Sequence, residues 1–137
     1  MELIEKIFFA NGAWLTILKG LAVTVEISAL SLFCGTILGA VICFLRVGKI
    51  LPLKIFAQIY ISIIRGSPVL MLLMLLFYGI FARSSLSPVT VAVITFSMHT
   101  AAYVAEILRS ALSAVDTGQI EAARTLGFSK TQTFKLV

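Results

Sequence analysis

Three long stretches of this chain contain no charged side chain: residues 27–45, 66–82 and 84–105. Each has about the length that a helix needs to cross the hydrocarbon core of a membrane, roughly 20 residues. An open strand at that depth would leave backbone polar groups unpaired in lipid, so each stretch must be helical. The sequence therefore predicts an all-α membrane protein, a multi-spanning helical bundle with three transmembrane helices.

The composition is that of a chain whose main solvent is the lipid bilayer. Of the 137 residues, 60% are hydrophobic and 12% are charged, whereas soluble domains average about 45–50% and about 25%. The net charge of +5 does not indicate nucleic acid as a partner, because the 11 basic residues are scattered singly. Basic residues in a membrane protein usually fix its orientation.

The cysteines and the single histidine indicate neither a disulfide nor a metal centre. Cys34 and Cys43 lie in one apolar run, where helical geometry separates them by roughly 13 Å. A disulfide needs Cα atoms within about 7 Å. Near His99, only Glu106 comes close to a ligand spacing, two turns away. We therefore expect no metal or other cofactor.

Residues 1–20 precede the first span. They open with Glu2 and Glu5 rather than basic residues and lack a small-residue cleavage site, so they do not indicate a signal peptide. Apolar residues recur near helical spacing, and Trp14 sits where an interfacial aromatic is favoured. We expect an amphipathic segment on the membrane surface. A helical extension of the first span is the alternative.

The first span carries a face of small residues. Ser31, Gly35 and Gly39 recur every fourth residue, which lets another backbone approach closely. This pattern predicts helix packing rather than a ligand site.

Prolines mark the entries to the second and third spans. Pro68 either opens the second span or kinks a helix that enters the membrane earlier, because apolar residues 59–64 precede it. Ser87-Pro88 opens the third span in the same way. The expected spans are about 22–45, 57–82 and 86–108.

Basic residues gather on one side of these spans. The link between the second and third spans holds only Arg83. With Lys6 and Lys19 before the first span, Arg83 makes three basic residues on one side. The connection before the second span and the segment after the third hold the others: Arg46, Lys49, Lys54, Arg65, Arg109, Arg124, Lys130 and Lys135. By the positive-inside rule, we expect both of these segments in the cytoplasm and the N-terminus outside.

Residues 113–131 are polar and carry helix boundary signals. Asp116 with Gln119 forms a capping-box pattern, as does Ser129 with Gln132. Gly127 lies between them, where a glycine usually ends a helix. The pattern predicts a helix over 117–126, a sharp turn and a second helix from about residue 130.

The first of these helices is too short and too polar to span a membrane, so we expect it at the cytoplasmic surface. The small side chains of Ala122 and Ala123 protrude little from the helix, which suits entry into a groove on a partner. Glu121 and Arg124 supply charges for contacts at the edge of that groove. On physical grounds alone, an ordinary interfacial loop helix is the favoured alternative.

Four motifs resemble those of bacterial binding-protein-dependent ABC permeases. Residues 121–127, Glu-Ala-Ala-Arg-Thr-Leu-Gly, resemble the EAA signature. Residues 65–68, Arg-Gly-Ser-Pro, resemble the Arg-Gly-Thr-Pro span entry of the polar amino-acid subfamily, with Ser67 in place of threonine. Residues 101–109, Ala-Ala-Tyr-Val-Ala-Glu-Ile-Leu-Arg, and 115–119, Val-Asp-Thr-Gly-Gln, resemble its third-span run and its lead-in to the EAA motif.

The resemblance implies a partial type I ABC importer permease over residues 21–137, with two further spans after Val137. It implies that the loop at 113–131 couples to an ATPase through Glu121, Ala122, Ala123 and Gly127. The implied partners are cytoplasmic ABC ATPase subunits, a second permease subunit of the same or a similar chain, and an extracytoplasmic amino-acid-binding protein. The implied location is a bacterial cell membrane.

The chain is not expected to be an enzyme, because its sequence contains no nucleophile–base pair or metal cluster at a plausible spacing. It also contains no G-x-x-x-x-G-K-[ST] phosphate loop. ATP would therefore bind to the partner ATPase.

A polar stripe on the third span supplies candidate pathway residues. Thr95, His99, Tyr103 and Glu106 share one helix face, and polar groups at membrane depth usually face a cavity or another helix. The functional hypothesis is that His99 and Tyr103 line a path for an amino acid. The alternative is hydrogen bonding between helices, with a Glu106–Arg109 pair. Ser67 could likewise contact substrate, although capping the second helix is its favoured use.

Two other functions stay open at this point. One is a small multi-pass scaffold or assembly protein without a pore, and the other is an ABC permease for another small polar solute.

Overall fold

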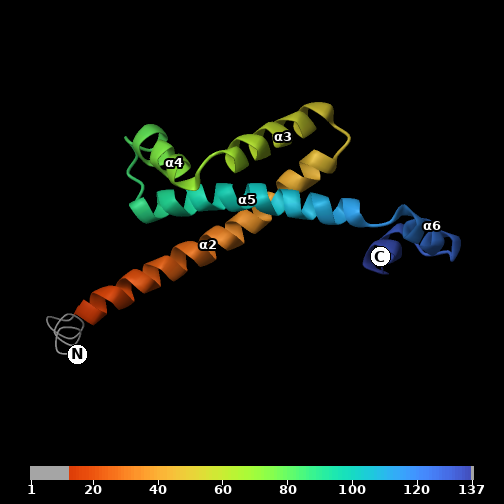
Figure 1. Ribbon diagram of the computed structural model, residues 1–137, viewed down its shortest axis with the longest axis horizontal. Helices are drawn as coiled ribbons and strands as arrows, with labels where there is room; N and C mark the ends of the chain where they lie inside the picture. The colour runs from red at the N-terminus through yellow and green to blue at the C-terminus, as the bar shows by residue number, and fades with distance from the viewer. Residues whose placement is uncertain (1–12, 137) are drawn as a thin grey trace.

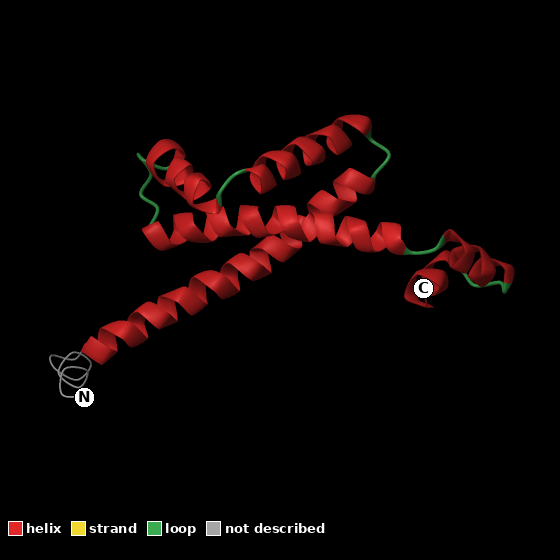
Figure 2. Ribbon diagram, in the orientation of Figure 1, coloured by secondary structure: helices red, strands yellow, loops and turns green. Residues whose placement is uncertain are grey.

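The structure is a computed structural model that describes residues 13–136, and every regular element in this part of the chain is a helix (Figures 1 and 2). The elements in order are α2 (Ala13–Val47), α3 (Leu51–Gly66), α4 (Val69–Met74), the π-helix η2 (Leu75–Ile80), α5 (Pro88–Ala114), α6 (Thr117–Thr125) and α7 (Lys130–Leu136).

Two helices, α2 and α5, are long and apolar enough to cross a membrane, and a third span results if α3 and α4–η2 are taken as one bent pair. The predicted all-α, multi-spanning class is confirmed.

Helix α2 is longer than a membrane is thick. Its 35 residues extend about 52 Å, against about 30 Å for the hydrocarbon core. Residues 13–20 belong to this continuous helix, as in the alternative of a helical extension of the first span. Residues 1–12, which carry most of the predicted amphipathic segment, lie outside the described part of the chain.

The small-residue face of α2 packs directly on α5, where the two long helices cross (Figure 1). Ser31, Gly35 and Gly39 are all buried. A Cβ atom added at Gly35 would lie 2.7 Å from Cβ of Thr100, and one added at Gly39 would lie 2.7 Å from Cβ of Val104. These distances leave no room for a side chain, so the predicted close packing is confirmed.

Helix α5 is the centre of the bundle and meets its neighbours through alanines. Ala101, Ala102 and Ala105 are completely buried. One apolar cluster joins Ala101 and Ala105 to the end of α2 and the middle of α3: Ile42, Cys43, Ala57, Ile61, Ala101 and Ala105. A second cluster holds α4 and η2 on α5: Ile64, Leu72, Leu76, Val91 and Ala102. Both cysteines are free, as expected.

The segment predicted as the second span consists of two helical parts with a sharp bend between them. Helix α3 begins at Leu51, earlier than the predicted start at 57, and ends at Gly66. Ser67 and Pro68 are both extended, and the axis of α4–η2 turns by 107° from that of α3. Pro68 has no backbone N–H, and a residue before proline avoids the helical region, so the helix must stop there. The structure thus has a helix on each side of Ser67-Pro68 with a break between them, and the point at which the chain enters the membrane stays a prediction.

The serines beside the two prolines behave differently. Ser87 caps α5, because its hydroxyl accepts a hydrogen bond from the Thr90 N–H at 3.1 Å. The Ser67 hydroxyl instead donates to the carbonyl of Ile63 at 2.8 Å, back into α3. The expectation that Ser67 caps the following helix is therefore wrong, because the extended backbone after Gly66 leaves this hydroxyl beside the last turn of α3.

Candidate functional site

Two regions of the molecule hold the predicted functional residues: the α6–α7 hairpin beyond the end of α5, and a polar cluster where α2, α3 and α5 meet. In Figure 1 the hairpin lies at one end of the molecule, past the last turn of α5 and on the side away from α4.

Helix α6 starts with an aspartate cap. Oδ1 of Asp116 accepts a hydrogen bond from the Gly118 N–H at 2.9 Å. The backbone N–H of Gln119 donates to the Asp116 carbonyl at 3.1 Å. Among the described residues the Gln119 side chain makes no return bond, so this end has an N-cap but not the predicted capping box.

Helix α6 ends in a Schellman turn built on Gly127. The Gly127 N–H donates to the Arg124 carbonyl at 3.0 Å, and the Phe128 N–H donates to the Ala123 carbonyl at 3.2 Å. This double pattern requires a left-handed residue after the helix, and Gly127 has φ of +84°. A Cβ atom there would meet nothing within 4 Å. The glycine is needed for its backbone angle, as predicted, and not for space.

The start of α7 is fixed by a complete capping box. The Ser129 N–H donates to Oε1 of Gln132 at 2.8 Å, and the Gln132 N–H donates to Oγ of Ser129 at 3.3 Å. The predicted box at this end is confirmed. Together with the Schellman turn, it sets the direction in which α7 leaves α6.

The two alanines of the EAA-like run face different ways. Ala123 is buried, as is Thr133 on α7, so these residues form the inner face of the hairpin. Glu121 and Ala122 are exposed. The expectation that both alanines form one outward surface is wrong for Ala123, because α7 folds back over that side of α6. Leu126, 77% exposed at the turn, is an apolar tip that the sequence analysis did not single out.

The polar stripe of α5 divides into three parts. Thr95 is fully buried, and its hydroxyl donates to the carbonyl of Val91 in its own helix at 2.8 Å, which leaves it no free donor. The His99 and Tyr103 rings lie 5.0 Å apart between centroids. Nδ1 of His99 is buried and has no hydrogen-bond partner among the described residues. The Arg65 guanidinium lies 5.2 Å from the centre of the Tyr103 ring, within range of a cation–π contact.

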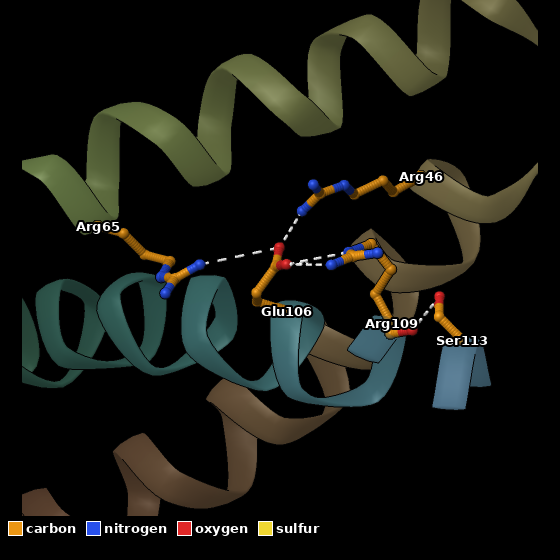
Figure 3. Close-up of polar contacts among 5 residues, drawn as sticks. All are labelled: Arg46, Arg65, Glu106, Arg109 and Ser113. Carbon is orange, nitrogen blue, oxygen red and sulfur yellow. Dashed lines mark hydrogen bonds and ion pairs between the residues drawn. The ribbon is translucent and has the colours of Figure 1, made fainter. Parts of the chain in front are cut away.

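Glu106 is the centre of an ion-pair cluster that joins three helices (Figure 3). Its Oε1 accepts from Nη2 of Arg109 at 2.6 Å, as predicted for this pair. Its Oε2 is bonded by Nη1 of Arg46 from α2. Nη1 of Arg65, at the end of α3, lies 3.8 Å from the same oxygen. Glu106 is thus a structural link between helices as well as a member of the stripe.

Sequence reasoning missed Arg46 and Arg65 in this cluster, although a signal was available. Arg46 is the first charged residue after the uncharged stretch 27–45, and Glu106 is the first after 84–105. Two spans that cross the same membrane bring such residues to the same depth, so their pairing could have been expected. Ser67 stands apart from this pairing at the bend after α3.

Comparison with known proteins gives a consistent assignment. Residues 31–137 match the family described as "Binding-protein-dependent transport system inner membrane component". The chain is 44% identical over 120 residues to the probable amino-acid ABC transporter permease protein YckA of Bacillus subtilis, covering 87% of this chain and 53% of YckA. It is 37% identical over 113 residues to the arginine transport system permease protein ArtQ of the same organism, covering 81% of this chain and 52% of ArtQ.

A solved structure, described as an amino acid ABC transporter with histidines, superposes with a TM-score of 0.73 at 32% identity, over 90% of this chain and 61% of that one. The chain spans about half the length of the curated relatives that it matches. With the family match over residues 31–137 and a shared fold, the chain belongs to the binding-protein-dependent transport system inner membrane components, a family of integral membrane permeases.

Proposed function

We propose that this chain forms part of the membrane-spanning permease subunit of an ATP-driven amino-acid importer. The relatives described as amino-acid permeases support the solute class. The observation that carries the proposal is the α6–α7 hairpin: a short polar helix, closed at both ends by caps, that lies beyond the last turn of an apolar helix. A hairpin held by these caps in that position can transmit a movement of a soluble partner to α5.

The coupling residues act in two ways in this proposal. Exposed Glu121 and Ala122, with the apolar tip at Leu126, offer a contact surface to a cytoplasmic ATPase subunit that binds ATP. Buried Ala123 and left-handed Gly127 instead keep α6 and α7 in one fixed arrangement. The contact and its rigidity are therefore separate properties that separate variants can test.

The path for the solute is proposed to run beside the His99–Tyr103 pair on α5. The buried Nδ1 of His99, which has no partner among residues 13–136, has lost hydration that a solute group could replace. The hydroxyl of Tyr103, a residue 41% exposed, is available to the same space. Ser67 is a weaker member, because its hydroxyl is already used by Ile63.

In the proposed assembly, a second permease subunit completes the path and an extracytoplasmic binding protein delivers the amino acid. We propose a bacterial cell membrane as the location, and the charge bias supports an orientation with α6 and α7 in the cytoplasm and the start of α2 outside.

The test is reconstitution of the full-length protein with its ATPase subunits and binding protein in vesicles, followed by uptake of a labelled amino acid. Uptake should require ATP. Ala122→Trp should abolish uptake and lower ATPase binding, because a large side chain on the outward face of α6 blocks a close contact. Ala114→Trp, the same change at an exposed position at the end of α5, is the matched control. An assembled complex that never accumulates amino acid would favour a scaffold instead.

A further inference from the structure

A polar cavity of about 440 Å³ lies between the ends of α2 and α3 and the middle of α5. We call it the basic cavity. It is lined by Arg46, Gln58, Ile61, Ser62, Arg65 and Glu106. Neither the proposed ATPase contact nor the proposed solute path uses these six residues as a set.

The basic cavity has more positive than negative charge. Both oxygens of Glu106 are already bonded, one by Arg109 and the other by Arg46. Arg65 is only 3.8 Å from the oxygen that Arg46 uses, and its side chain is 41% exposed. One carboxylate cannot neutralise three guanidinium groups, so Arg65 in particular remains able to bind a second anion.

Two uncharged hydrogen-bond donors, Gln58 and Ser62, also line the basic cavity. Gln58 and Ser62 are spaced by four on α3, one turn apart on the face that also carries Arg65. Both are exposed, and neither side chain bonds to any residue that the structure describes. An amide NH2, a hydroxyl and a guanidinium on one helix face form a donor set that suits the oxygens of an anion.

The charged end of the basic cavity lies at headgroup depth. Arg46 and Glu106 each directly follow an uncharged membrane-spanning stretch, so both sit where the hydrocarbon core ends. The Arg65 side chain points from the end of α3 toward Glu106 (Figure 3), and long basic side chains keep their charged heads near membrane interfaces. In the proposed orientation this is the cytoplasmic leaflet, where anionic lipids and basic pockets between transmembrane helices meet.

The neighbouring face of α3 suits acyl chains. Ile59 and Ile63 are exposed apolar residues one turn apart, and Ile63 follows Gln58 and Ser62 along the helix in the direction of the hydrocarbon core. A lipid whose headgroup enters the basic cavity would have apolar surface beside it along the same helix, whereas a free inorganic anion would gain nothing from that surface.

We propose that the basic cavity binds the phosphate group of an anionic phospholipid, with Arg65, Gln58 and Ser62 as donors and Arg46 supplying further positive potential. Such a lipid bridges α2, α3 and α5 at the level of the ion-pair cluster and neutralises charge that Glu106 leaves uncompensated. This inference depends on membrane insertion and does not depend on which solute the protein moves.

The test titrates the full-length protein, purified in a neutral detergent, with short-chain phosphatidylglycerol, short-chain phosphatidylcholine, inorganic phosphate and glycine. Binding is followed by calorimetry and by native mass spectrometry. Phosphatidylglycerol should bind tightest, and added salt should weaken it. Arg65→Gln should weaken its binding about fivefold, the effect typical of one basic residue near a membrane surface, and Arg65→Lys should largely restore it.

Two further variants separate the site from general charge and from misfolding. Gln58→Leu with Ser62→Ala removes two donors but no ion pair, and it should also weaken phosphatidylglycerol binding. Arg83→Gln removes the same charge from the link between η2 and α5 and should change nothing. Equal binding of phosphatidylcholine, unchanged binding by Arg65→Gln and the double variant, or displacement of the lipid by equal concentrations of phosphate or glycine would each overturn the proposal.

Discussion

Replacing Gly127 by valine separates the shape of the α6–α7 hairpin from its surface. A left-handed backbone costs a residue with a Cβ roughly 1–2 kcal/mol. Because a Cβ atom at Gly127 would meet nothing within 4 Å, this whole cost comes from the backbone angle of +84°. A penalty of about 1–2 kcal/mol changes a two-state ratio by about 5–30-fold.

If the backbone relaxes, the two hydrogen bonds of the Schellman turn are lost, the one from Gly127 to Arg124 and the one from Phe128 to Ala123. Each such bond contributes about 0.5–1.5 kcal/mol net, so the turn cannot relax without further cost. We expect α7 in Gly127→Val to point in a new direction in a large share of molecules.

Two measurements follow this change. In a variant with Cys34 and Cys43 replaced by alanine, spin labels on cysteines placed at Gln119 and Lys135, one on each helix, report the distance between α6 and α7. In the reconstituted complex, the ratio of amino acid taken up to ATP hydrolysed reports coupling. Gly127→Val should broaden the distribution of distances between the labels and lower the ratio of amino acid taken up to ATP hydrolysed. Gly127→Asn should have a smaller effect on both quantities, because asparagine tolerates the left-handed region.

Gly66→Ala is the matched control, because Gly66 also has nothing within 4 Å of an added Cβ but lies in an ordinary helical turn. It should behave as the unmodified protein in both measurements. An unchanged distance distribution in Gly127→Val would refute the argument that this glycine sets the hairpin. A changed distance with normal uptake per ATP would refute the coupling role while leaving the structural argument intact.

Three other predictions test the bundle, the cluster and the path. Gly39→Leu should separate α2 from α5, because Val104 already occupies the space, and should destabilise the protein by about 1–3 kcal/mol. The measurement is the temperature of thermal aggregation in detergent, which should fall. An unchanged aggregation temperature would contradict the close packing. Glu106→Gln should lower the melting temperature by leaving its arginine partners without their shared counter-ion, and equal melting temperatures would show that the cluster contributes nothing. His99→Leu and Tyr103→Phe should each reduce uptake in the full-length protein at normal membrane levels, whereas full uptake would leave the pair as packing only.

The features that the sequence predicted well depend on nearby residues and on the membrane itself. Most of each uncharged stretch is helical, as backbone in lipid requires, although Ser67 and Pro68 within 66–82 are extended. The small face at Ser31, Gly35 and Gly39 needs only helical spacing to be recognised. The Gly127 turn and the Ser129–Gln132 box are likewise short-range patterns, since each bond joins residues at most five positions apart.

The features that the sequence analysis missed depend on contacts between distant segments. Ala123 is turned inward because α7 folds over it, and nothing in the run Glu-Ala-Ala distinguishes its two alanines. The Arg46–Glu106 pair joins residues 60 positions apart. Helical spacing alone assigns Glu106 only the nearer Arg109. The missing step was to compare the depth at which each uncharged stretch ends, which puts Arg46 and Glu106 at one level.

The bend after α3 has two properties with different causes: its position follows from the local sequence, and its angle follows from packing against α5. Pro68 forces the preceding residue out of the helical region, so a break at Ser67 follows from the sequence. The size of the turn does not, because an extended pair of residues can send the chain on in many directions. The angle of 107° is reached where Leu72 and Leu76 can be buried with Val91 and Ala102 of α5. Those partners lie beyond the next connection in the chain. Pro68 therefore accounts for the end of α3, and packing against α5 accounts for the direction of α4 and η2.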